Sequence, residues 1–249
     1  MNKKLWKDLS KIDPIVPKLF KHKQTEKEQL AAIKSNNFVN IYQPTERAQL
    51  KAVSNSNDIQ YIHNPSEKVQ LAAVKEGGEN IRFIHNPSEK VQLAAVEEYG
   101  ECIRFIHNPS EKVQLAALKC ADNNIQFIHN PSEEVQLAAV KCAGNNIQYI
   151  HNPSEKVQLA AVKEYGDNIQ YIHNPSEEVQ LAAVEEYGEC IRFIRNPSEE
   201  VQLAAVKCAD NNIQYIHNPT DKVISAYLNM DPELVKILAD PKYDLETEE

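Results

Sequence analysis

Apolar and polar residues alternate along the chain in a pattern that returns every 22 residues. The first full copy covers residues 64–85 and reads NPSEKVQLAAVKEGGENIRFIH. Asn-Pro opens each later copy, at Asn86, Asn108, Asn130, Asn152, Asn174, Asn196 and Asn218. A short and regular period is typical of a stacked repeat array, in which one copy cannot bury its own apolar face. The pattern therefore predicts that each copy gains its stability from its neighbours.

The beginning of each copy predicts a helix start. Asn64 is expected at the N-cap, where its side-chain oxygen accepts a backbone N–H. Pro65 fits the first helical position, because its missing N–H would be unpaired there. Glu67, three residues after Asn64, is expected to reach back to the N–H of the cap. The sequence thus places the helix start at Asn64-Pro65.

The body of the copy predicts one α-helix and a second, shorter element. Val69, Ala72 and Ala73 share one narrow helical face, and the alanines allow a neighbouring helix to approach closely. Gly78 is expected to end this helix with a positive φ. Residues 81–85 predict a short α- or 3₁₀-helix. A β-strand is the alternative for these residues, since Ile-Arg-Phe-Ile also favours strands.

These elements predict an all-α fold, namely an elongated, superhelical α-solenoid of about ten two-helix repeats with terminal caps. Residues 1–24 are predicted to form a basic N-terminal cap that covers the open end of the array; a basic arm that docks on a partner is the alternative. Two degenerate repeats follow in residues 25–65, and seven near-identical repeats in residues 66–219. Residues 220–249 are expected to form a C-terminal capping repeat with an acidic tail.

The motif VQLAAV, followed by a glycine turn, IQYI and NP, resembles the α-solenoid families that have very short units. The leucine-rich variant repeats are the most similar, and HEAT-type repeats resemble the chain more loosely. The resemblance covers residues 25–241 and implies a helix that alternates with a 3₁₀ segment. The 22-residue unit departs from these families, as does Gln70, where they often carry Arg. The chain also resembles 22-residue repeats of AT-rich bacteria and their phages.

Residues at equivalent positions of successive copies form columns, and an apolar column that never changes predicts core. One such column holds Ile62, Ile84, Ile106, Ile128, Ile150, Ile172, Ile194 and Ile216. A second holds Leu71, Leu93, Leu115, Leu137, Leu159, Leu181 and Leu203. The invariant glutamine column that begins at Gln70 is expected to hydrogen-bond the loop of the adjacent repeat.

Two neighbouring columns provide the candidate partner contacts. An aromatic column keeps its ring and varies its hydroxyl, which predicts a packed ring with a solvent-facing edge. The column next to it alternates between Gln and Arg, and an Arg pair could bind a carboxylate or a phosphate. Packing between repeats and local ion pairs are the alternative roles. The predicted contacts are Arg82, Arg104, Arg192, Arg195, Gln126, Gln148, Gln170, Tyr149, Tyr171 and Tyr215.

The same repetition argues against catalysis and against a metal site. An active site needs unlike groups that converge in a pocket, whereas a repeat array presents rows of one group. Histidines form a column at His63, His85, His107, His129, His151, His173 and His217, but neighbours one repeat apart are about 9 Å from each other. A pH-sensitive histidine ladder is an alternative. We therefore predict no enzyme activity, no cofactor and no metal.

The chain has 249 residues and a net charge of −9. This acidic balance favours a basic protein partner and disfavours nucleic acid. The five cysteines and the absence of a signal-peptide pattern predict a cytoplasmic protein with reduced thiols, and no segment is apolar enough to span a membrane. Self-association through the ends of the array is a further expectation.

The sequence thus favours a non-enzymatic protein-binding scaffold or inhibitor that uses the curved face of a solenoid. One alternative is an acidic mimic of nucleic acid, or an inhibitor of a host defence protein carried by a phage or another mobile element. For such a mimic, the glutamate column that begins at Glu67 would supply the acidic stripe. A second alternative is a HEAT-like module that binds nucleic acid.

Overall fold

The structure is a computed structural model that describes residues 24–35, 41, 43–54 and 58–230. The chain divides into two compact units, residues 1–120 and residues 121–249. The predicted N-terminal cap, except for Gln24, and the acidic C-terminal tail lie outside the described residues.

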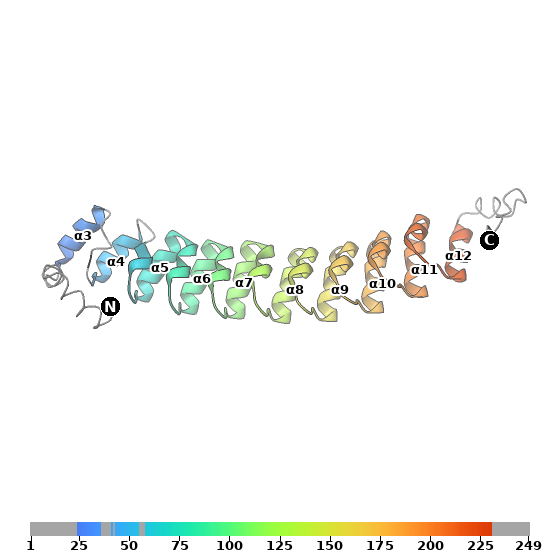
Figure 1. Ribbon diagram of the computed structural model, residues 1–249, viewed down its shortest axis with the longest axis horizontal. Helices are drawn as coiled ribbons and strands as arrows, with labels where there is room; N and C mark the ends of the chain where they lie inside the picture. The colour runs from blue at the N-terminus through green and yellow to red at the C-terminus, as the bar shows by residue number, and fades with distance from the viewer. Residues whose placement is uncertain (1–23, 36–40, 42, 55–57, 231–249) are drawn as a thin grey trace, which may run out of the picture. The chain divides into compact units, whose positions relative to one another are not determined.

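The described residues of the first unit are mainly helical, and from α4 onward each α-helix is followed by a 3₁₀-helix (Figure 1). The elements are α3 (Glu26–Lys34), α4 (Glu46–Val53), η2 (Asp58–Tyr61), α5 (Glu67–Glu76), η3 (Gly78–Phe83), α6 (Glu89–Glu98), η4 (Gly100–Phe105) and α7 (Glu111–Cys120). Each α-helix packs against the next one from α3 to α7, and η2, η3 and η4 pack in the same order.

The second unit repeats this arrangement. Its elements are η5 (Asp122–Phe127), α8 (Glu133–Cys142), η6 (Gly144–Tyr149), α9 (Glu155–Glu164), η7 (Gly166–Tyr171), α10 (Glu177–Glu186), η8 (Gly188–Phe193), α11 (Glu199–Cys208), η9 (Asp210–Tyr215) and α12 (Asp221–Met230). Neither unit contains a strand in its described residues. The predicted solenoid of 22-residue helix pairs is therefore confirmed, and the second element is a 3₁₀-helix.

Five apolar positions per repeat form the core. In the repeat of α5 these are Val69, Ala73, Val74, Ile81 and Ile84, all at most 7% exposed. The equivalent residues are buried in the other central repeats, except Ile213, which is half-buried. The predicted core column from Ile62 to Ile216 is buried throughout and is confirmed. Because the first three lie on the α-helix and the other two on or just after the 3₁₀-helix, the core fills the space between these two layers.

The predicted leucine core column is wrong. Leu71 and its equivalents, as well as Ala72, are only half-buried. The face that packs between helices is formed by Val69, Ala73 and Val74 instead. Leu71 and Ala72 are therefore partly exposed to solvent.

The helix start also differs from the prediction. Ser66, not Asn64, is the N-cap of α5, and its hydroxyl accepts a hydrogen bond from the Val69 N–H at 3.4 Å. Thr25 and Thr45 cap α3 and α4 in the same way. A short hydroxyl side chain next to the first turn satisfies one of the N–H groups that a helix start leaves unpaired.

The positive φ that was expected at Gly78 occurs instead at the asparagine of the Asn-Pro pairs from Asn64 to Asn196. Asn64 has φ 55°, and the equivalent asparagines up to Asn196 are also in the left-handed region. Asparagine tolerates this conformation better than most residues, because its short polar side chain can hydrogen-bond locally. None of the six glycines, all of which lie in described residues, has a positive φ. The sharp turn between repeats is therefore made by Asn, directly before Pro.

Gly78 serves close packing and not helix termination. It is the first residue of η3, and a Cβ built on it would lie 2.6 Å from the Ala95 carbonyl oxygen and 2.9 Å from the Cys102 sulfur. Glycine at this position therefore allows η3 to lie directly against α6 and the start of η4.

A hydrogen bond between carboxylate and hydroxyl joins successive repeats. The Ser88 hydroxyl donates to Glu67 at 3.0 Å, while Lys90 lies 3.5 Å from the same carboxylate. Ser154 donates to Glu133, which also pairs with Lys156 at 3.6 Å. We use the name repeat latch for this contact between the N-cap hydroxyl of one repeat and the first-turn Glu of the repeat before it. Glu67 does not reach back to its own helix start, as was predicted, but forward to the next repeat.

The glutamine column bonds chiefly to its own repeat. The Gln70 amide donates to the Pro65 carbonyl at 2.9 Å. The predicted bond to the adjacent repeat occurs at Gln29, whose oxygen accepts from the Thr45 N–H at 2.9 Å, and at Gln202, which accepts from Thr220 at 3.3 Å.

Candidate binding surfaces

Three of the four predicted arginine contacts lie on 3₁₀-helices, where they contact acidic and aromatic neighbours. Arg82 lies 3.6 Å from Glu79 and 4.7 Å above the ring of Phe83. Arg104 has the same arrangement with Glu101 and Phe105, and Arg192 with Glu189 and Phe193. Arg192 also pairs with the largely buried Asp167 of the preceding repeat at 3.3 Å. Each arginine thus neutralises a carboxylate of its own 3₁₀-helix.

Where Gln replaces Arg, the partner three residues earlier changes with it. The amides of Gln126, Gln148 and Gln170 donate to the backbone carbonyls of residues 123, 145 and 167, at 2.9–3.0 Å. The residue three positions earlier is Glu before each Arg of this column and Asn or Asp before each of these Gln residues. This coupled exchange is readable in the sequence and shows that the column forms local contacts, as the alternative role proposed. Whether it also binds a partner stays a prediction.

The predicted tyrosine contacts and Arg195 differ in their exposure to solvent. Tyr149 and Tyr171 are 40% and 41% exposed, and they lie on the adjacent helices η6 and η7. Tyr215 is half-buried, and Arg195 is exposed two residues after η8. The structure therefore places the predicted tyrosines, arginines and glutamines on the 3₁₀ layer of each unit, without gathering them into one pocket.

Two separate hollows lined by leucines lie between α-helices of the first unit. The hollow between α3 and α4 has a volume of ≈ 870 Å³, with Leu30 and Leu50 among its lining residues. The hollow between α5 and α6 has ≈ 680 Å³ and is lined by Leu71 and Leu93, which the sequence had assigned to the core. Lysine or arginine side chains stand around both hollows, at Lys27, Lys34, Arg47, Lys51, Lys75, Lys90 and Lys112. We call these two hollows the leucine groove.

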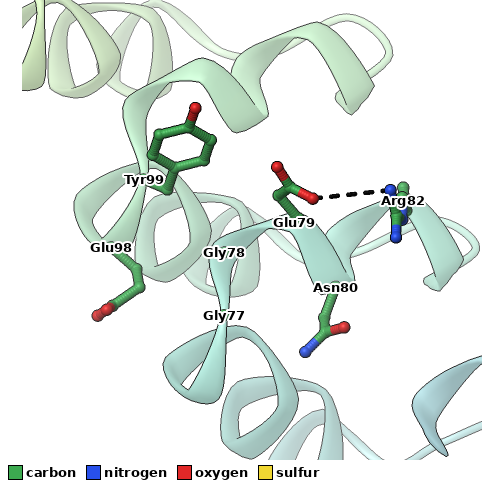
Figure 2. Close-up of a pocket in the computed structure, with 7 residues that line it drawn as sticks. All are labelled: Gly77, Gly78, Glu79, Asn80, Arg82, Glu98 and Tyr99. Atoms are coloured by element: carbon green, nitrogen blue, oxygen red, sulfur yellow. Dashed lines mark ion pairs between the residues drawn. The ribbon is translucent and has the colours of Figure 1, made fainter. Parts of the chain in front are cut away.

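A smaller pocket of ≈ 280 Å³ lies where α5 ends and η3 begins (Figure 2). The Tyr99 ring from the following repeat stands on one side of it, and the Glu79–Arg82 ion pair on the other. Gly77 and Gly78 supply backbone between them.

Two of the five cysteines are buried, and the other three are exposed at the ends of α-helices. Burial raises the pKa of the Cys102 and Cys190 thiols to about 12, so both stay protonated at neutral pH. Cys120, Cys142 and Cys208 are exposed at the ends of their α-helices. All five thiols are free.

The histidines of the column are exposed from His63 to His217. Among the described residues, no group of three or more His, Cys, Asp or Glu side chains is placed to hold a metal ion. No helix in that part of the chain is long and apolar enough to cross a membrane. No family model, curated protein or solved structure matches the chain.

Proposed function

We propose that the chain is a non-enzymatic protein-binding scaffold, and that its leucine groove holds a segment of the partner. The observation that carries this proposal is the row of half-buried leucines that lines two hollows between adjacent α-helices. Exposed apolar surface that is rimmed by polar residues is typical of sites where proteins bind one another. The repeats thus supply both the framework and the apolar floor.

The charges around the groove indicate the character of the segment. Seven Lys or Arg side chains line the two hollows, against the carboxylates of Glu26, Glu89 and Glu97. A segment with apolar side chains spaced for the leucines and with acidic residues between them would complement both features. The groove therefore favours an acidic, amphipathic segment of a protein.

A selection from a displayed random-peptide library tests this proposal. Peptides enriched on the intact chain should carry apolar and acidic residues, and they should lose at least tenfold in affinity when Leu71 and Leu93 are both changed to Glu. The matched control changes Leu159 and Leu181, at the same positions of the second unit, and should retain binding. Because all four side chains are half-exposed, the variants are expected to remain folded. Failure to enrich any peptide, or equal binding by the groove variant, would overturn the proposal.

A second candidate is recognition of a basic partner by residues 121–230. This segment carries 15 Asp and Glu against 7 Lys and Arg, and α10 contributes Glu177, Glu178, Glu185 and Glu186. An excess of one charge steers an oppositely charged partner and makes association sensitive to salt. This candidate keeps open the role of an inhibitor or charge mimic; binding of a basic protein that persists when Glu178 and Glu185 are both changed to Lys would exclude it.

We also infer kinship with the leucine-rich variant repeats. The regular alternation of an α-helix with a 3₁₀-helix supports this resemblance, because the same alternation is what that family would imply.

A further inference from the structure

Gly77 occupies a position that larger residues fill in the other repeats. Its equivalents in the central repeats are Tyr99, Ala121, Ala143, Tyr165, Tyr187 and Ala209. Gly77 has φ −176° and ψ 117°, and Tyr165 has φ −163° and ψ 119°. A Cβ added to Gly77 would meet only the Asn80 amide nitrogen, at 3.8 Å, an ordinary contact distance. Neither the backbone conformation nor the packing therefore requires glycine here.

The second unit shows what a tyrosine does at this position. The Tyr165 ring stacks on that of Tyr187 in the next repeat, with the centroids 5.8 Å apart and the planes 18° from parallel. Stacked rings at such distances attract each other beyond the burial of their apolar surface. Tyr187 is half-buried, whereas Tyr99 is 41% exposed.

Tyr99 has the local setting of Tyr187 but lacks the stacking ring. Each tyrosine is followed two residues later by a glutamate, Glu101 or Glu189, which hydrogen-bonds its hydroxyl and raises its pKa. The residue that would stack on Tyr99 is Gly77, and the ≈ 280 Å³ pocket of Figure 2 lies at this position. The pocket is therefore the space of a missing side chain, with an aromatic ring exposed on one wall.

We propose that this pocket, which we call the Tyr99 slot, binds an aromatic side chain presented by a partner protein. The incoming ring would lie on Tyr99 as Tyr165 lies on Tyr187, and the Glu79–Arg82 pair and Glu98 would form a polar rim. An aromatic residue suits such a slot, because it gives a large contact area at a low cost in side-chain entropy. The slot lies outside the leucine groove, and the variants that test the two sites share no residue.

The test uses p-cresol, which reproduces the tyrosine side chain, as an NMR probe of the full chain. Saturation-transfer and titration experiments should detect one site with a Kd in the millimolar range, as expected for so small a ligand. Gly77→Tyr should abolish this binding, because the new ring stacks on Tyr99 from within the chain. Tyr99→Ala should abolish it by removing the wall.

A gain of binding provides the matched control. Tyr165→Ala uncovers the Tyr187 ring and should add a second p-cresol site. The variant should remain folded, because Ala already stands at this position in the repeats of Ala121, Ala143 and Ala209. Ethylguanidinium, which carries the guanidinium group and the last two carbons of an arginine side chain, should bind at least fivefold more weakly than p-cresol. The proposal is overturned if p-cresol binds Gly77→Tyr as well as it binds the parent, if Tyr165→Ala gains no site, or if ethylguanidinium is the stronger ligand.

Discussion

The adjacent glycines at the end of α5 have opposite environments. A Cβ on Gly77 meets only one atom at contact distance, whereas a Cβ on Gly78 would collide with the Ala95 carbonyl and the Cys102 sulfur. The two glycines therefore contribute differently to the fold. Gly77 leaves a space beside Tyr99, whereas Gly78 allows η3 to pack closely against α6.

Alanine substitutions separate these two roles. Gly77→Ala should leave the free energy of unfolding unchanged or raise it by about 0.4–1 kcal/mol, because it reduces the freedom of the unfolded chain. Gly78→Ala should lower it by about 1–3 kcal/mol through overpacking. Urea denaturation followed by circular dichroism measures both changes. Equal effects of the two substitutions would contradict the distinction.

At the residue scale, the sequence does not distinguish which of Asn64 and Ser66 caps the helix, because both residue types are good caps. A comparison with the degenerate repeats contains the missing signal. Thr25, Thr45 and Thr220 keep a hydroxyl at the position of Ser66, whereas Gln43 replaces Asn and still has a positive φ of 49°. The hydroxyl is what the helix start requires, and the turn needs only a residue that accepts the left-handed conformation.

At the element scale, the latch makes the contact between repeats sensitive to pH. The hydrogen bond from Ser154, followed by the charge of Lys156, lowers the pKa of the Glu133 carboxyl from its usual value of 4.5. A lowered folded-state pKa means that the ionised carboxylate stabilises the fold above about pH 4.5, and that this stabilisation is lost as the pH falls through the lowered pKa.

Glu133→Gln tests this dependence, because the amide oxygen can still accept from Ser154 while the charge is absent. At pH 7 the variant should melt at a lower temperature than the parent. The difference should be smaller at pH 3 than at pH 7, because protonation of the parent carboxylate increases as the pH falls toward its lowered pKa. Glu134→Gln, at the neighbouring exposed position of α8, is the control for a general change in net charge. A constant difference between Glu133→Gln and the parent at both pH values would show that the latch charge does not contribute.

The elements themselves were predictable, and the exposure of their side chains was less so. The 22-residue period and the apolar spacing predict an α-helix and a second, short α- or 3₁₀-helix over residues 81–85. The structure has a 3₁₀-helix there, Gly78–Phe83, which begins earlier than predicted. The leucine column was assigned to the core because it never changes, but copies that are nearly identical keep surface residues as faithfully as buried ones. The helix also has two apolar stripes, Val69-Ala73-Val74 and Leu71-Ala72, and only packing against neighbours decides which one is buried.

The candidate binding sites could also be predicted from the sequence only in part. The predicted arginines, Tyr149 and Tyr171 are exposed, as the alternation between Gln and Arg and between Phe and Tyr suggested, whereas Tyr215 is half-buried. The Tyr99 slot was missed, because it arises from the absence of a side chain at Gly77. The sequence does show that Gly77 stands where other repeats have Tyr or Ala. Only the stacked pair of Tyr165 and Tyr187 in the structure shows that this replacement leaves an aromatic ring uncovered.

At the scale of the whole molecule, each described repeat contacts its immediate neighbours within its unit. The stability of such a chain is close to a sum of repeat and nearest-neighbour terms. Because the residues that meet at one junction are matched at the next, removal of a complete copy should bring equivalent surfaces together.

Deletion of residues 174–195 tests this additivity. The deletion should give a folded protein with nearly the same helical signal per residue, since Ser198 then takes the place of Ser176 opposite Glu155. Deletion of residues 174–184, half a repeat, should abolish cooperative unfolding because it places a 3₁₀-helix where an α-helix must pack. Circular dichroism and urea titration compare the two. Loss of the fold in the whole-copy deletion would show that the copies are not interchangeable.

The repeat latch has a consequence for a chain under tension. Its bonds join a repeat to the one before it, as Ser88 joins Glu67, so a force applied at the ends has to open them one after another. Each rupture would release 22 residues, or up to about 75 Å of extended chain. Pulled from both ends, the protein would therefore be expected to lengthen in steps of nearly equal size, one repeat at a time.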